Sequence, residues 1–114
     1  MCGKSVSETV ATGVLGTNRE VVEVIAHARE IGGSDGGVAG AVSLVLPGQS
    51  ISKEFRAMHS WPPRREELQE AIDDLKRIIS STRCGFLDRN KGQISLMLNQ
   101  INSETVLSAL SIPN

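Results

Sequence analysis

The chain has few aromatic side chains and no cluster of basic ones. Of its 114 residues only 3% are aromatic, with one Trp, two Phe and no Tyr. The core is therefore expected to consist of Val, Ile, Leu, Met and Ala. Twelve Lys and Arg against thirteen Asp and Glu are spread along the chain and give a net charge of −1. Because nucleic-acid binding normally rests on clustered cations, we expect no direct nucleic-acid partner.

Cysteines and long apolar runs are also scarce. The two cysteines, Cys2 and Cys84, are too few for a disulfide framework. The opening residues show no apolar stretch of the kind found in secretory signals. The longest apolar run, residues 38–46, is much shorter than a bilayer-spanning helix. The sequence therefore predicts a cytoplasmic protein without a membrane partner.

The overall composition is that of an ordinary globular protein. Hydrophobic residues make up 39% of the chain and charged residues 22%, which excludes a disordered or fibrous chain. A length of 114 residues suits one domain. We therefore predict a single domain over residues 1–114, with residues 1–8 as a flexible arm.

Hydrophobic spacing and turn residues predict four elements in the first half. Residues 9–15, rich in Val and Thr, predict a short strand or an ordered arm. Residues 17–31 predict a helix, capped by a side-chain oxygen and ended by two glycines. The apolar run 38–46 predicts a central strand, ended by a Pro-Gly turn. Residues 50–60 fit a strand or a helix, and we favour the helix because apolar residues recur there at helical spacing.

The second half begins with the clearest helical pattern in the chain. Residues 64–83 combine an apolar stripe with a charged face, which predicts an amphipathic helix after two prolines. Residues 85–89 and 93–99 flank Asn-Lys-Gly at 90–92, which predicts an antiparallel hairpin. A last helix is expected over 103–110, capped at Asn102 or Ser103. Together these elements predict an α/β or α+β fold in two layers, with a three- to four-stranded sheet packed by about four helices.

No complete catalytic or metal-binding motif can be identified. Residues 88–94 resemble a calcium loop, but one position is missing and no closing carboxylate follows. Cys84, His27 and His59 share no metal-ligand spacing, and only the fold can make a nucleophile and base of them. We therefore predict no metal, no cofactor, no catalytic residue and no enzymatic activity.

Two sets of residues are candidates for protein contacts. One gathers the only Trp, a Phe and a Met next to arginines, a composition typical of interface hot spots. This predicted partner-binding set is Phe55, Met58, Trp61, Arg56 and Arg64. The predicted helix at 17–31 is apolar on more than one side, which suggests that a second subunit covers part of it. The predicted dimer-interface set is Val21, Val24, Ile25 and Ala28.

These observations favour a small regulatory protein that acts by binding another protein, such as a transcription factor or a signalling protein, and that forms a homodimer. The alternative is a domain that binds a small molecule or nucleotide through the glycine-containing turns at 13–18 or 32–37. An enzyme whose site is assembled only by the fold is the third possibility.

Overall fold

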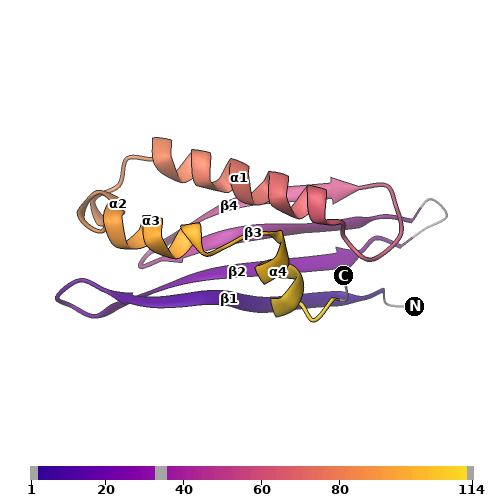
Figure 1. Cartoon of the computed structure of the whole chain (residues 1–114), viewed down its shortest axis with the longest axis horizontal. Coiled ribbons are helices and arrows are strands. Elements are labelled where there is room, and N and C mark those ends of the chain that lie inside the picture. The colour runs from indigo at the N-terminus through magenta and orange to yellow at the C-terminus, as the bar shows by residue number, and fades with distance from the viewer. Residues whose placement is uncertain (1–2, 33–35, 113–114) are drawn as a thin grey trace.

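The computed structural model of the chain describes residues 3–32 and 36–112. Four antiparallel strands come first: β1 (Ser5–Leu15), β2 (Glu20–Glu30), β3 (Val38–Leu46) and β4 (Gln49–Ala57). They lie side by side in chain order, β1-β2-β3-β4. Four helices follow: α1 (Arg65–Ser81), α2 (Gly85–Arg89), α3 (Lys91–Asn99) and α4 (Ser103–Ala109). The predicted two-layer α+β class is confirmed (Figure 1).

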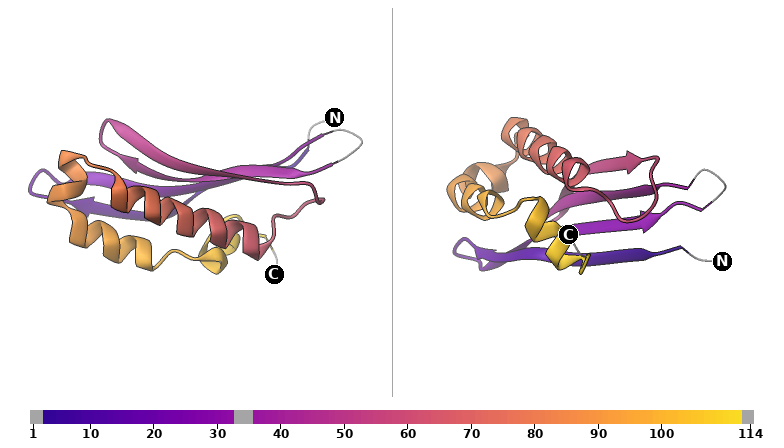
Figure 2. Two further views of the ribbon diagram at one scale, coloured as in Figure 1. Left: turned by 90° about the horizontal axis from the view of Figure 1, so that it is seen from above. Right: turned by 45° about the vertical axis from the view of Figure 1, so that its right-hand side comes forward.

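All the helices lie on one face of the sheet (Figure 2). The longest helix, α1, packs along β4 and β3, whereas α3 and α4 pack on β1. Between the layers lies one cluster of aliphatic side chains. Its fully buried members include Val22, Val24, Val42, Leu44, Leu68, Ile72 and Leu75. The opposite face of the sheet, which carries no described helix, is called the bare face below.

β2 shows how the chain divides its residues between these two faces. Val22, Val24 and Ala26 are buried under the helices, and the residues between them point to the bare face. This alternation follows from the two-residue period of a strand. The predicted helix at 17–31 is therefore wrong. Apolar residues on both faces of β2 imitate the broad apolar stripe of a buried helix.

The strand β4 occupies most of the segment 50–60, for which a helix was favoured. Ile51, Lys53 and Phe55 lie on the helix side of the sheet at every second position, so the favoured helix at 50–60 is wrong and the strand alternative holds. The tight turn before it has Gly48 at φ 82°, as expected for the third position of a type II turn.

The segment 85–99 is helical, so the predicted antiparallel hairpin there is wrong. Asn90 joins α2 to α3: its backbone N–H donates to the carbonyl of Phe86, and its own carbonyl accepts from Ile94. Its side-chain amide donates to the Phe86 carbonyl as well. Asn90 therefore continues helical hydrogen bonding instead of reversing the chain.

The remaining elements match their predictions closely. β3 has the predicted bounds, and α1 lies within residues 64–83. α4 begins at a capping box in which the side chains and backbones of Asn102 and Thr105 hydrogen-bond to each other.

β1 begins four residues earlier than expected, so Ser5 to Glu8 pair with β2 rather than forming an arm. The rest of that arm lies partly outside the described residues.

Candidate functional site

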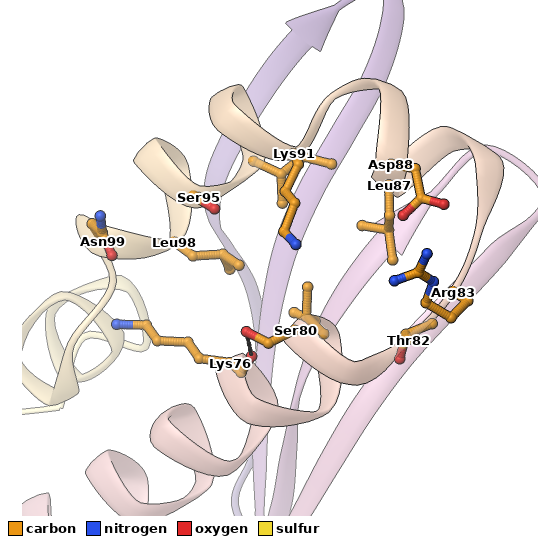
Figure 3. Close-up of a pocket in the computed structure, with 12 residues that line it drawn as sticks. Lys76, Ser80, Thr82, Arg83, Leu87, Asp88, Lys91, Ser95, Leu98 and Asn99 are labelled. Atoms are coloured by element: carbon orange, nitrogen blue, oxygen red, sulfur yellow. Dashed lines mark hydrogen bonds between the residues drawn. The ribbon is translucent and has the colours of Figure 1, made fainter.

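A groove runs between the C-terminal half of α1 and the pair α2–α3. The two segments lie side by side and run in opposite directions (Figure 1). Side chains from both point toward one another across the gap (Figure 3). The apolar floor of this helix groove consists of Ile79, Leu87, Ile94 and Leu98. All four side chains are at most one-tenth exposed, so the floor is part of the core rather than a loose surface patch.

Three cations and one carboxylate line the rim. Lys76 comes from α1, Arg83 from the connection to α2, and Lys91 from the start of α3; Asp88 is the carboxylate. Lys76 Nζ donates to the carbonyl of Ile101 at 3.2 Å, which holds that ammonium group at one end of the groove. Ion pairs recorded within residues 3–32 and 36–112 use Lys53, His59, Arg65 and Arg77 instead. The rim is therefore positively charged.

Polar side chains complete the lining. Ser80 Oγ donates to the Lys76 carbonyl at 3.0 Å, and Thr82 Oγ1 donates to the Ile78 carbonyl at 2.6 Å. Each hydroxyl oxygen keeps lone pairs for a further donor. Ser95 and Asn99 line the groove from α3, with Asn99 at the end where Lys76 lies (Figure 3). An apolar group of a ligand could pack on the floor, and an anionic group could bind the cations at the rim.

The predicted partner-binding residues do not form one surface. The ring of Phe55 lies on the helix side of β4, in the space left by Gly40, which is its pair on β3. Arg56 points to the bare face instead. Met58, Trp61 and Arg64 do share the loop between β4 and α1, where Met58 is 65% exposed and Trp61 packs against the core. Lys4 Nζ lies 6.0 Å from the centre of the Trp61 ring.

The predicted dimer residues divide between the two faces of the sheet. Val24 and Ala28 are fully buried in the core of this chain, so they do not face a second subunit. Val21 and Ile25 lie on the bare face, where Val21 is 52% exposed. Two of the four predicted residues therefore lie on an uncovered surface. The reason given for them, a broad apolar face on a helix, does not apply because the segment is a strand.

The β4–α1 loop also holds a paired histidine. His59 Nε2 and Glu67 Oε1 form a close ion-paired hydrogen bond, and His59 Nδ1 donates to the Ser60 carbonyl at 2.8 Å. The Ser60 carbonyl and then Glu67 raise the pKa of His59 against opposing effects of burial and Arg64. Glu67 Oε2 is buried without a hydrogen-bond partner, so this carboxylate depends on His59 for its charge balance.

Cys84, His27 and His59 are not brought together. Cys84 precedes α2 and accepts a hydrogen bond from Gln49 at the first residue of β4. His59 follows the far end of that strand, and His27 points to the bare face. Backbone N–H groups of Leu87 and Phe86 lower the pKa of Cys84. Among the described residues, no three His, Cys, Asp or Glu side chains are placed to hold a metal ion.

The glycine turns proposed for anion binding lack the required helix. Residues 16–19 connect β1 to β2, so no helix N-terminus follows Gly13 or Gly16. The turn at 32–37 connects two strands and lies partly outside the described residues. No helix within the described chain is long and apolar enough to cross a membrane.

Sequence reasoning missed Lys76, Arg83 and Lys91 because it placed strands at 85–89 and 93–99. A helical signal was present: Leu87, Ile94 and Leu98 are spaced by seven and four residues, which puts them on one helical face. Comparisons of the chain with protein-family models, with curated proteins and with solved structures find no match.

Proposed function

We infer that this chain is a non-enzymatic regulator that binds another protein, such as a transcription factor or a signalling protein. In this proposal the helix groove receives an acidic segment of the partner. The observation that carries it is the apolar floor between Ile79 and Leu98, bordered by three cations against one carboxylate. Interfaces typically combine a desolvated apolar anchor with a complementary charged rim.

The size of the groove favours a side chain of a protein over a whole small molecule. Its cavity volume is about 120 Å³. Drug-sized ligands normally occupy clefts of about 300–1,000 Å³. A Leu, Ile or Met of a peptide fits on the floor, and a neighbouring Asp or Glu then reaches Arg83 or Lys91. A short anionic molecule with an apolar tail is the second candidate, because it would use the same two features.

The cytoplasm remains the proposed compartment. Cys84 forms no disulfide within residues 3–32 and 36–112, and thiols are kept reduced in the cytosol. This supports a reducing environment and leaves the identity of the partner open to the experiment below.

The test is a selection of random peptides displayed on phage against the purified chain. We expect enriched peptides to place Asp or Glu within a few residues of Leu, Ile, Phe or Met. Fluorescence polarisation then gives the Kd of one labelled peptide for wild type, Arg83→Glu and Lys91→Glu. Each charge reversal should raise the Kd about tenfold or more, because the acidic peptide then meets a like charge.

Arg64→Glu is the matched control, since it reverses a charge in the β4–α1 loop, which also contains Met58 and Trp61. An unchanged Kd for this variant supports the groove. Loss of binding in Arg64→Glu, with Arg83→Glu and Lys91→Glu unaffected, would move the partner site to the loop. A selection that enriches no acidic, apolar peptide would refute the proposed function.

A further inference from the structure

The bare face of the sheet has a hollow at one end of its two central strands. Ala39 and Ala41 form the floor, because their short side chains leave room on β3. Arg29 and Arg56 flank Ala39 from the neighbouring strands, and His27 flanks Ala41. Glu54, on the other side of Ala41, completes the rim. This end of the face therefore carries two guanidinium groups and an imidazole against one carboxylate.

Further along the same strands the charge changes sign. Glu23 lies on the bare face of β2 opposite Val45. Beyond it, Val14 and Val21 pair with each other and are 54% and 52% exposed. Ile25, the central residue of β2, lies between the acidic and the basic ends of this face. The bare face is thus positive at one end and both acidic and apolar at the other. In the middle, the apolar Ile25 lies in one row with the hydroxyl side chains of Thr9, Ser43 and Ser52.

We propose that the bare face binds the bare face of a second copy of this chain, about a two-fold axis that crosses the strands near Ile25. This rotation places each strand of one copy over the same strand of the other copy, and the two strands run in opposite directions. Glu23 of each copy then lies over His27 of the other, at the entrance to the hollow, and Arg29 lies two residues further along, over Val21. The two Ile25 side chains meet at the axis, so the contact is self-complementary, as a two-fold interface requires.

Charge selects this orientation over the other face-to-face arrangement. A two-fold axis along the strands would superimpose the same ends of both copies. It would gather Arg29 and Arg56 of both chains at one end and leave Glu23 of both chains together elsewhere. Like charges brought together in this way cost binding free energy, whereas the crossing axis places each Glu23 over the His27 of the other copy and near its Arg29.

The area of the bare face approaches that of one side of a protein interface. Four strands spaced by ~4.8 Å, with about nine residues each at ~3.3 Å, project an area of roughly 550 Å² before side-chain relief is counted. A stable interface buries about 800 Å² of accessible surface on each partner. The projected area of the bare face is about two thirds of that value, and the relief of the side chains adds to it. Sheets packed face to face lie about 10 Å apart.

Sedimentation velocity over a dilution series tests the proposal with wild type, Glu23→Arg, Arg29→Glu and the charge-swapped double variant. We expect a wild-type dimer that dissociates on dilution. Each single reversal should raise the dimer Kd at least about tenfold, because it removes the attraction between Glu23 and Arg29 across the interface and brings like charges close together. The double variant should recover dimerisation, since its charges are exchanged but still opposite.

Glu66→Arg, at an exposed residue in the first turn of α1, is the control and should dimerise like wild type. Both substituted side chains of the test point away from the core, and thermal unfolding followed by circular dichroism verifies that each variant folds. The proposal is overturned if wild type is a monomer at every concentration, or if both single variants dimerise as wild type does. It is likewise overturned if the double variant stays monomeric while folded. None of these outcomes depends on whether the helix groove binds a peptide.

Discussion

At the scale of single residues, two side chains are positioned by partners that are not their neighbours in the sequence. Phe55 occupies the place of the missing side chain of Gly40, its cross-strand pair. His59 neutralises the partly buried Glu67. Neither pair is visible in the sequence, because 15 residues separate the first and eight the second. Each depends on a register or a loop path that only the fold supplies.

Gly40→Ala should destabilise the protein strongly. A Cβ at this position would lie 2.1 Å from the His27 carbonyl oxygen and 2.6 Å from Cζ of Phe55. Because one obstacle is backbone, the strands themselves must separate, and overpacking of this kind costs about 1–3 kcal/mol. Urea unfolding measures the change in the free energy of unfolding.

Gly92→Ala is the control, since nothing lies within 4 Å of its added Cβ. In α3 this change should instead stabilise by roughly 0.5–1 kcal/mol. Equal effects of the two variants would contradict this account of the Phe55–Gly40 contact.

The pair His59–Glu67 should make stability depend on pH. The Ser60 carbonyl and Glu67 raise the pKa of His59 in the folded state, so the folded protein binds the proton more tightly than the unfolded chain. The resulting stabilisation is fully present below the unfolded pKa, about 6.5. It is lost as the pH rises through the higher folded pKa. His59→Gln should therefore cost about 1–2 kcal/mol at acidic pH and less at alkaline pH.

Denaturant unfolding of wild type and His59→Gln across this pH range measures the difference. An NMR titration of His59 in Glu67→Gln provides the independent check, because loss of the carboxylate should lower the pKa. A difference in unfolding free energy that is flat with pH, or larger at alkaline pH, would show that the ion pair does not couple to folding.

At the scale of elements, success and failure follow from how many faces of an element are buried. α1 was predictable because its charged face meets solvent and its apolar stripe meets the sheet. β3 was predictable because it is an uninterrupted apolar run between turn residues. β2 misled because Val21 and Ile25 are apolar on the bare face, which hides the alternation with Val22 and Val24.

The predictions for the segments that form β4 and α3 were wrong for local reasons. Lys53, on the helix side of β4, interrupts the apolar alternation because it reaches Asp74 of α1 at 3.8 Å. In α3, Ile94, Leu96 and Leu98 alternate like a strand, yet Leu96 is 66% exposed and only the other two are buried. The Asn-Lys-Gly sequence at 90–92 resembles a turn, but Asn90 links two helices. The helix groove was missed with this segment, since Lys91 lies on α3.

At the scale of the whole molecule, the sheet protects its edges and leaves one face uncovered. On the two edge strands, Glu8 and Lys53 both lie on the helix side of the sheet. A register shift between Thr9 and Ala11 further interrupts β1. Inward-facing charges and bulges are features that prevent strands of different molecules from pairing. Association is therefore expected through the bare face, with the edges kept apart.

Removing the edge charges should change the mode of association. In the Glu23→Arg background, which lacks the proposed face-to-face dimer, Glu8→Val with Lys53→Val should produce species larger than a dimer. β1 of one molecule pairing with β4 of the next is a head-to-tail contact that does not close, so it continues into chains. Loss of the half-exposed Lys53–Asp74 pair costs at most about 1 kcal/mol, so the variant should still fold.

Sedimentation velocity and light scattering distinguish the two outcomes, with Glu66→Val in the same background as the control for lost charge. If the edge variant sediments as a monomer like the control, edge charges are not what keeps this sheet from extending. If it forms long assemblies while Glu23→Arg alone does not, the two surfaces act separately. The bare face then limits assembly to a pair, because a two-fold contact uses up its own surface, and the charged edges prevent pairs from joining further.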